Sequence, residues 1–342
     1  MAALLPQHCA LCGRRENLLR CAGCQVVYYC GRDHQTTDWK AHKGACSQTT
    51  KAHRRFAHEE SLIRDVPQFG MGWTWEDSVG RFWGILETRD YMRARYGYVV
   101  ALLAHNTVDG VERAVEHELD MLRLCRSDNM GIRNMAPHLL LRLGRDQEAY
   151  DFLKWWATTG NEGDYDWGDM SHPHLNLKGE NAFEKVEGFF DSRYGSLNHK
   201  LVATLLKIRL WLELRDVRNA DIALRDALPR ELLDMIKTRV VRSDVVARRQ
   251  DLIEHTDRAG PEMRALQKQI RTMINAVRLN NEFMLPRLFA PNVDWNRSPQ
   301  SYSMGSREEA QLTLNYCYLA WAETPGAIDV AKKALAAVRA AS

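Results

Sequence analysis

CALCGRRENLLRCAGCQVVYYCGRDHQTTDWKAHKGAC, residues 9 to 46, decides the fold of the first part of this chain. It holds six of the chain's eight cysteines and two histidines, spaced as two C-x2-C pairs, a C-x3-H pair and an H-x3-C pair. Zinc prefers four N or S ligands in a tetrahedron, and eight such ligands divide into two complete Cys3His sites. A segment this short cannot build an apolar core of its own, so we expect bound metal to supply most of its folding free energy. The candidate ligands are Cys9, Cys12, Cys21, Cys24, Cys30, His34, His42 and Cys46.

Other uses of cysteine fit the sequence less well. No apolar run typical of a signal peptide opens the chain, so we expect an intracellular, reducing compartment, either nucleus or cytoplasm, in which thiols stay reduced. Iron–sulfur clusters prefer ligation by thiolates alone, whereas this set contains two histidines. No stretch reaches 18 uninterrupted apolar residues, which predicts no membrane-spanning helix. Cys125 and Cys317 lie within apolar helical patterns and are interpreted as small core residues.

The local pattern indicates how the ligands are shared between two ions. Residues 17 to 29 predict two short strands around the Cys21–Cys24 pair, and residues 31 to 45 predict a helix. A hairpin on a short helical pair favours interleaved sets, in which ligand pairs along the chain alternate between the two ions. Sequential pairing, in which the first four ligands bind one ion and the last four the other, stays open at this point. The interleaved sets are Cys9, Cys12, Cys30 and His34 for one zinc ion, and Cys21, Cys24, His42 and Cys46 for the other.

This segment resembles the MYND finger. The match consists of Cys9-x2-Cys12, Cys21-x2-Cys24, Tyr29-Cys30 and the run His34-Gln35-x2-Asp38-Trp39-x2-His42-Lys43-x2-Cys46. The family usually has cysteine where this chain has His34, and histidine ligates zinc equally well. The resemblance implies a small zinc-stabilised ββα-type finger with two structural Zn²⁺ ions and interleaved ligand sets. A RING finger fits less well, because no C-x2-C pair closes the motif.

What the resemblance implies for function is protein interaction. MYND fingers hold short proline-containing peptides along a hairpin edge beside an exposed tryptophan. Carried to this chain, the candidate peptide-binding residues are Gln35 and Trp39, and the candidate edge is the strand from Gln25 to Tyr28; packing of Trp39 inside the finger is the alternative. In such strand addition, main-chain hydrogen bonds supply affinity and an aromatic ring selects proline. We therefore expect an adaptor whose finger takes a short peptide and whose remaining domain takes a second protein.

Length and charge bound the rest of the chain. Its 342 residues leave room for the finger and one large domain or two small ones. The net charge of +3, with basic residues interspersed among acids, does not favour nucleic-acid binding. The basic run from Lys237 to Arg249 is interleaved with valines and is interpreted as the solvated face of a helix or strand.

Beyond the finger the helical period dominates. We expect the finger at 1–47, a connecting helix and hinge at 48–75, and an α-helical domain at 76–342. Turns at near multiples of the tetratricopeptide length weakly resemble that repeat, which predicts an irregular α-solenoid or array. The expected helix pairs are 88–125 with a turn at Asp109-Gly110, 134–157 with a turn at Gly144, 197–228 with a turn near Asp216, and 308–340 with a turn at Pro325.

Residues 160–180 predict a long acidic loop over the helices. Its carboxylates and its His-x-His pair are ligand types that a divalent ion accepts, but its glycines and proline argue against a rigid site. The residues are Glu162, Asp164, Asp166, Asp169, His172 and His174. Our hypothesis is that this loop contacts a basic peptide.

Catalytic motifs are missing from the sequence. SET-domain lysine methyltransferases also carry MYND fingers, but they need a motif resembling Asn-His-Ser-Cys, and Asn198-His199-Lys200 lacks the cysteine. No glycine-rich phosphate loop and no Gly-x-Ser-x-Gly occurs either. We therefore expect no enzymatic activity; a lysine methyltransferase-like or metal-dependent enzyme using the helical body is the alternative.

Overall fold

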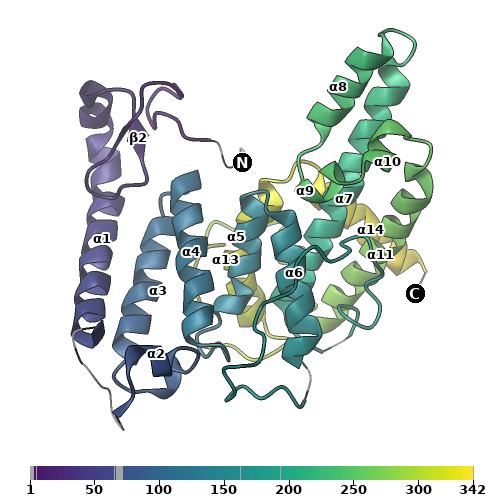
Figure 1. Ribbon diagram of the computed structural model, residues 1–342. Helices are drawn as coiled ribbons and strands as arrows, with labels where there is room; N and C mark the ends of the chain where they lie inside the picture. Colours follow the sequence, from purple (N-terminus) through teal and green to yellow (C-terminus); the bar gives the residue numbers. More distant parts are fainter. Residues whose placement is uncertain are drawn as a thin grey trace. The chain divides into compact units, whose positions relative to one another are not determined.

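The computed structural model describes residues 4, 6–64, 66, 72–161, 163–192 and 194–341. A small hairpin finger is followed by a mostly helical body, and the chain forms two compact units (Figure 1). The N-terminal unit comprises the described residues of 2–139 and 166–174, and the C-terminal unit those of 140–165 and 175–342. The expected domain boundaries at residues 47 and 75 stay predictions. Most of the expected hinge at 66–75 lies outside the described residues.

The finger begins the N-terminal unit. Its strands β1 (Leu19–Arg20) and β2 (Tyr28–Tyr29) pair antiparallel, with Leu19 opposite Tyr29. Helix α1 (Arg32–Arg64) follows and runs for 33 residues. The helix expected over 31–45 is confirmed as the start of α1, whereas its short extent was wrong. The helix continues past the last ligands because neither proline nor glycine occurs between Ala45 and Arg64.

Three helices form the layer on which the finger rests. Helices α3 (Arg89–Leu103) and α4 (Val108–Leu124) lie beside α1, with α3 in contact with both (Figure 1). Phe56 of α1 stacks on Tyr98 of α3, with ring centroids 5.9 Å apart, within a buried aromatic core. The short elements of this unit are α2 (Trp75–Ser78), η2 (Phe82–Gly84) and η3 (Ile132–Asn134).

The turn expected at Asp109-Gly110 was wrong, because both residues lie in the first turn of α4. Thr107 caps this helix, and its side chain accepts a hydrogen bond from the backbone N–H of Gly110. A Cβ on Gly110 would lie 2.8 Å from the carbonyl oxygen of Leu102. This glycine therefore permits close contact between α3 and α4.

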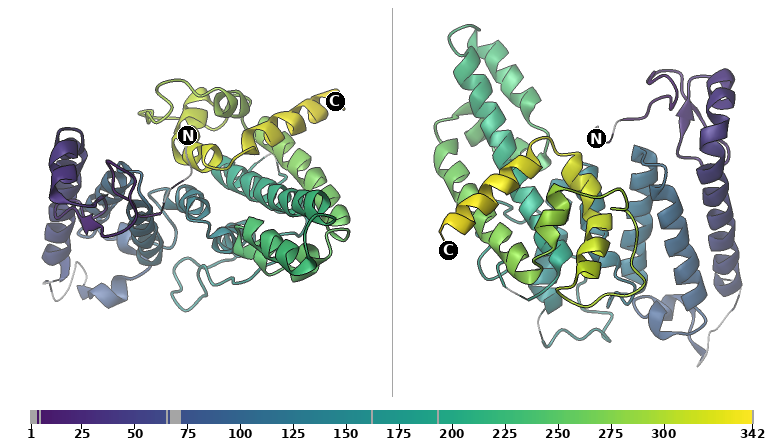
Figure 2. Two further views of the ribbon diagram at one scale, coloured as in Figure 1. Left: turned by 90° about the horizontal axis from the view of Figure 1, so that it is seen from above. Right: turned by 180° about the vertical axis from the view of Figure 1, so that it is seen from behind.

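The C-terminal unit surrounds one long buried helix, α7 (Leu197–Leu224). Most positions of α7 up to Leu214 are buried, as a helix enclosed by others requires. It contacts four long helices of the unit, α6, α11, α13 and α14, and Figure 2 shows α11 and α14 beside it. The other helices are α5 (Ala136–Arg142), which crosses the division between the units, α6 (Asp146–Ala157), η4 (Thr159–Asn161), α8 (Arg230–Val240), α9 (Asp244–Ala247), α10 (Gln250–Glu254), α11 (Ala259–Asn280), α12 (Met284–Phe289), α13 (Arg307–Ala322) and α14 (Ala327–Ala340).

Three of the four expected helix pairs are confirmed, and the pair at 88–125 forms with its turn at 104–107 instead of at Asp109-Gly110. Gly144 and Gly326 adopt left-handed conformations, with φ of 72° and 83°, in the turns that separate α5 from α6 and α13 from α14. The turn near Asp216 was wrong, because α7 continues through it to Leu224. With one turn displaced and the turn near Asp216 absent from α7, the tetratricopeptide-like arrangement stays a prediction.

The basic run from Lys237 to Arg249 is only partly the solvated face that the sequence predicted. Lys237 is buried, and its Nζ lies 2.7 Å from a carboxylate oxygen of Asp234. Val245 and Val246 are buried as well. Among the described residues, no helix is both long and apolar enough to pass through a bilayer.

Candidate metal centres and peptide-binding surface

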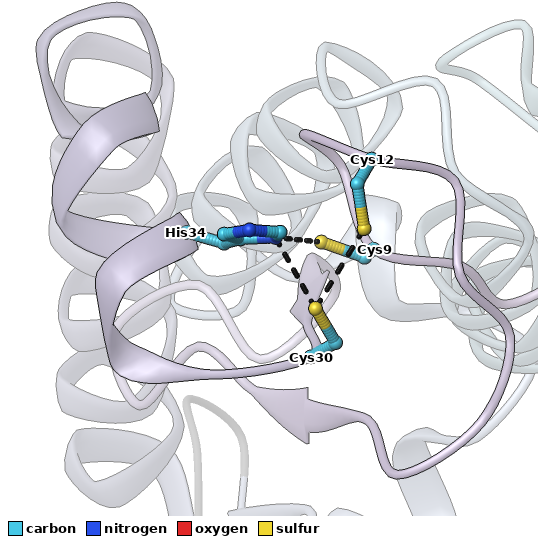
Figure 3. A group of neighbouring side chains, drawn as sticks. All are labelled: Cys9, Cys12, Cys30 and His34. Atoms are coloured by element: carbon cyan, nitrogen blue, oxygen red, sulfur yellow. Dashed lines mark hydrogen bonds between the residues drawn. The ribbon is translucent and has the colours of Figure 1, made fainter.

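The first set of ligands, site 1, lies where the N-terminal loop meets the start of α1. Cys9 and Cys12 come from the loop, Cys30 directly follows β2, and His34 lies in the first turn of α1 (Figure 3). His34 Nδ1 lies 3.4 Å from the Sγ of Cys9 and 3.2 Å from that of Cys30. The Sγ atoms of Cys12 and Cys30 are 3.6 Å apart.

The second set, site 2, joins the hairpin knuckle to the next turns of α1. Cys21 and Cys24 hold the knuckle, and His42 and Cys46 come from α1. The Sγ atoms of Cys21 and Cys46 are 3.7 Å apart, and His42 Nε2 lies 3.4 Å from Cys21 Sγ and 3.7 Å from Cys24 Sγ. Gly23 is required here for space, because a Cβ would lie 2.6 Å from the Sγ of Cys46.

The spacing of these donor atoms fits zinc. With Zn–S bonds of about 2.3 Å and Zn–N bonds of about 2.0–2.1 Å, a tetrahedron has S···S edges of about 3.8 Å and N···S edges of about 3.6 Å. The S···S distances of 3.6 and 3.7 Å and N···S distances of 3.2 to 3.7 Å match these edges. Within each set, all four donor atoms lie within 4.8 Å of one another. The two Cys3His sets therefore suit the two structural zinc ions expected from the sequence.

The structure settles which ligands share an ion. His34 and His42 lie eight residues apart on the continuous helix α1, which separates them by about 12 Å along its axis. Sequential pairing would require both histidines to reach one ion. The observed sets are the interleaved ones, so the alternative that sequence spacing left open is wrong.

Without a bound cation, the surroundings of the cysteine ligands shift their thiol pKa values in opposite directions. Burial would raise the pKa of the Cys9 thiol, but backbone N–H groups at Cys12, Cys30 and Leu11 outweigh it and lower that pKa to about 5. Burial raises the pKa of Cys24 to about 12, and the neighbouring thiolates of site 2 add to the increase. A bound Zn²⁺ removes this repulsion, so metal affinity falls as pH falls and protons compete for the sulfurs.

The finger is attached to the helices of its unit by buried polar contacts. The Oγ1 of Thr49 donates to the carbonyl of Ala101 at 3.1 Å or pairs with His105 Nε2, which is 2.8 Å away. The ring centroid of His105 lies 5.6 Å from that of the ligand His42. The phenol of Tyr28 donates to the carboxylate of Asp109.

Sequence reasoning missed these contacts. Asp109 was assigned to a turn, while Thr49 and His105 had no assigned role. One signal could have located Asp109: Thr107 two residues before it matches a helix N-cap with an acid in the first turn. Nothing in the sequence could have paired it with Tyr28, which is 81 residues away.

The candidate peptide-binding residues both lie on α1, one turn apart. Trp39 is 43% exposed, so its ring is not enclosed inside the finger. Its centroid lies 6.1 Å from that of His42. Gln35 is half-buried directly after the ligand His34. Peptide binding by these two residues stays a proposal.

The expected peptide-binding edge, from Gln25 to Tyr28, was wrong. Gln25 lies in the turn with φ of 64°, and Tyr28 pairs on both sides, with Arg20 of β1 and with Cys9. The carbonyl of Tyr28 accepts a hydrogen bond from the backbone N–H of Ala10 at 2.9 Å. The edge that faces away from β2 belongs to β1, where Leu19 is 62% exposed.

The acidic loop at 160–180 is divided between the units and forms no third group of metal ligands among the described residues. In the N-terminal unit, Arg126 donates to the carbonyl of His172 at 2.9 Å. In the C-terminal unit, Tyr165 packs against Trp155 with ring centroids 5.6 Å apart. Glu162 lies outside the described residues.

Comparison with known proteins agrees with this site. The family model described as MYND finger matches residues 9–46. Egl nine homolog 1 of Homo sapiens is 46% identical over 57 residues, which are 16% of this chain and 13% of that protein. Histone-lysine N-methyltransferase ASHR1 of Arabidopsis thaliana is 42% identical over 43 residues, 13% and 9% of the two chains. Programmed cell death protein 2 of Rattus norvegicus is 26% identical over 149 residues, 40% and 37% of the two chains.

The chain thus spans well under half the length of these curated relatives. No solved structure matches it. Residues 9–46 form a MYND finger, which is a protein-interaction module.

Proposed function

We propose that this protein is an interaction adaptor: its finger binds short proline-containing peptides, and its helical body binds a second protein. The observation that carries the first part is the open edge of β1, together with the exposed ring of Trp39 on α1 next to Asp38, to which the hairpin residue Tyr29 donates.

The pairing pattern of the hairpin identifies the backbone groups that a peptide would meet. The N–H of Cys21 donates to the carbonyl of Val27 at 2.9 Å, which makes these two residues a hydrogen-bonded pair. The next pair, Arg20 and Tyr28, is then non-hydrogen-bonded, so the N–H and C=O of Arg20 point away from β2. An added peptide strand forms its main-chain hydrogen bonds with Arg20.

Side chains on one face of the hairpin favour an apolar peptide with proline. Leu19 lies opposite Tyr29 and shares its face, on which the Tyr29 hydroxyl donates to Asp38 of α1 at 2.7 Å. Leu19 is exposed on this face, and the exposed Trp39 directly follows Asp38 in α1. Proline suits an aromatic surface, because its ring is rigid and its backbone lacks an N–H that would need a partner.

Selection from a display library of nine-residue peptides, half of them with a fixed central proline, tests this proposal. We expect enrichment of the proline half, and a loss of affinity of about tenfold or more for the selected peptide with Trp39→Ala, since aromatic anchors dominate small interfaces. Lys40→Ala, an exposed neighbour on α1, is the matched control and should bind like wild type. Equal affinity of Trp39→Ala and Lys40→Ala would place the peptide elsewhere.

For the second partner we propose the outer face of α8. Two adjoining hollows of about 310 and 400 Å³ share Thr238 along this helix. Leu232 and Met235 are 47% and 58% exposed on it, and Arg239 and Arg242 form no ion pair or hydrogen bond with any residue that the structure describes. Glu231 and Asp234 also line the second hollow, so the surface carries charges of both signs. Its exposed apolar side chains suit the apolar anchors of a partner segment, and its two arginines suit acidic residues of that segment.

Cross-linking to cell-extract proteins followed by mass spectrometry tests the α8 face. Met235→Asp should remove the acidic partners, because it places a negative charge in the middle of the surface. Val293→Asp is the matched control, since Val293 is 95% exposed in another part of the same unit. Identical partner sets for both variants would contradict the assignment.

We also propose that the zinc ions serve structure and that the protein is not an enzyme. Four protein ligands complete each tetrahedron and leave no position for a catalytic water. The rival is a lysine methyltransferase-like or metal-dependent enzyme that uses the helical body. Elemental analysis separates them: two zinc per chain and no binding of S-adenosylmethionine favour the adaptor, and a third metal equivalent favours the rival.

Residence inside the cell, in nucleus or cytoplasm, belongs to this proposal, because zinc thiolates persist where thiols stay reduced. We also propose that the helices form an irregular, repeat-like array, although their unequal lengths do not by themselves require this arrangement.

A further inference from the structure

The two zinc sites differ in how far solvent reaches their ligands. In site 2 all four ligand side chains are buried, with exposed fractions between 2% and 6%. In site 1 only Cys9 is buried, whereas Cys12 is exposed and Cys30 and His34 are half-buried. The same type of ligand set therefore occurs in two different environments within one finger.

Site 2 is covered by residues of the helical layer. The His105 ring after α3 lies against His42, and Thr49 attaches this part of α1 to the end of α3. On the other side, the ring centroid of Tyr29 lies 5.9 Å from that of His42. A reagent reaches the sulfurs of site 2 only after a local opening that breaks these contacts.

At site 1, Cys12 is exposed and Cys30 is half-buried. The side chains of Cys12 and Cys30 point toward one another, with their Sγ atoms 3.6 Å apart (Figure 3). The loop that carries Cys12 is loosely packed: no heavy atom lies within 4 Å of the position that a Cβ on Gly13 would occupy. Exposed, metal-activated thiolates are the form of cysteine that oxidants attack.

We propose that Cys12 and Cys30 form a thiol-reactive site, in which a peroxide converts the two zinc-bound thiolates to a disulfide and releases the ion of site 1 alone. One thiolate attacks hydrogen peroxide, becomes a sulfenic acid and displaces hydroxide. The second thiolate attacks that sulfur and displaces a second hydroxide. Two thiolates lose two electrons, the O–O bond accepts them, and the products are one disulfide and two hydroxide ions.

The ion then retains only Cys9 and His34 as protein ligands, which is half of its tetrahedron, and it dissociates. The sulfurs must approach from 3.6 Å to about 2.05 Å, a shift that the exposed loop at Cys12 allows. Site 2 and the hydrogen bond from Tyr29 to Asp38 still hold α1 against the hairpin. This inference does not depend on peptide binding by the finger.

The test uses the zinc-loaded full chain and hydrogen peroxide, with a chromophoric zinc indicator. One zinc equivalent should be released first, and the second about tenfold or more slowly, because site 2 reacts only through local opening. Mass spectrometry after the first phase should find a Cys12–Cys30 disulfide, while Cys125 and Cys317, both buried, serve as internal unreactive thiols. Far-UV circular dichroism should show unchanged helix content at that point.

Release of both equivalents at one rate, first oxidation within site 2, or a disulfide that includes Cys9 would each overturn the proposal. Cys12→His keeps four zinc ligands and removes one thiolate of the pair, so it should retain two zinc and lose the fast phase. Cys125→Ala is the matched control and should keep the fast phase. If Cys12→His does not hold two zinc, the wild-type time course and the mapped disulfide decide.

Discussion

Tyr28 of the finger hairpin donates its phenolic hydrogen to the carboxylate of Asp109 in the first turn of α4. Arg20 and Gln7 complete the group: Arg20 Nε donates to the Tyr28 oxygen at 2.9 Å, and Gln7 Nε2 donates to Asp109 at 2.8 Å. Burial and the neighbouring Asp109 raise the pKa of Tyr28, so the phenol remains a donor at neutral pH. The zinc module is thereby bonded to the helical layer of its unit.

Removal of either partner of this bond should destabilise the N-terminal unit. Asp109→Asn takes away the charged acceptor, and we expect a loss of about 1–3 kcal/mol in the free energy of unfolding, as for other buried hydrogen bonds to charged groups. Urea titration of Asp109→Asn, Tyr28→Phe and the double variant measures the coupling between them. Strict additivity of the two losses would show that the bond contributes nothing of its own.

A glycine pair in adjacent helices provides a matched test of close packing. Gly110→Ala should cost about 1–3 kcal/mol, because its Cβ would lie 2.8 Å from the Leu102 carbonyl and force α3 and α4 apart. Gly97→Ala lies on the exposed side of α3 with no heavy atom within 4 Å, and it should raise stability by about 0.5–1 kcal/mol. Thermal unfolding of the two variants should shift in opposite directions.

Lys207 of α7 predicts a pH dependence in the C-terminal unit. Burial lowers the pKa of this lysine to about 7, and its Nζ donates to the carbonyls of Ala182 and Glu184 at 2.7 and 2.6 Å. Between about pH 7 and its unfolded value of 10.5, the unfolded chain binds more protons than the folded one. Stability from this group therefore rises with pH across that window.

Lys207→Met should flatten that rise. The measurement is the urea midpoint at several pH values from 7 to 10, taken as the difference between the variant and wild type so that other titrating groups cancel. A difference that does not change with pH would show that Lys207 stays charged in the fold.

Zinc removal should affect the helical layer as well as the finger. With a strong chelator, backbone amides of residues 9–46 should lose hydrogen-exchange protection, because metal supplies most of their folding free energy. Protection at the end of α3, near Ala101, should fall too, since Thr49 bonds there from a part of α1 that site 2 positions. Unchanged protection near Ala101 would mean that α3 does not depend on the metal; α11 in the other unit is the reference.

The zinc ligands could be predicted from sequence because ligand spacing is a local property: C-x2-C knuckles and i, i+4 pairs, one of them within α1 and the other at its start, bring donors together without help from the rest of the fold. Their pairing followed only once α1 was known to be continuous, since that places His34 and His42 two turns apart. The edge from Gln25 to Tyr28 was wrong because Cys9, far from it in sequence, pairs with Tyr28.

The helical period predicted the helices of the body better than their turns: the pair at 88–125 was predicted with its turn misplaced, and the turns marked by Gly144 and Gly326 were predicted correctly. Gly144 and Gly326 take left-handed conformations in the two turns, Gly326 as the N-cap of α14, and the turns there are confirmed. Gly110 is also a glycine, but it lies within α4 and permits close contact with Leu102 of α3, which the local sequence does not reveal. Around Asp216, polar residues suggested a turn, yet α7 is buried up to that point and neither glycine nor proline follows before Pro229, so the helix continues.

Helix α1 starts among the ligands of one ion, passes those of the other, and reaches Arg64 without interruption, a rod of about 50 Å. A cut at residue 47 would sever this rod and leave the rings of α3 that Phe56 covers facing water. Grafting experiments on this finger should therefore transplant the rod together with α3 and α4. Because the helix is unbroken, a displacement of its zinc-binding end is expected to move the whole helix as far as Arg64.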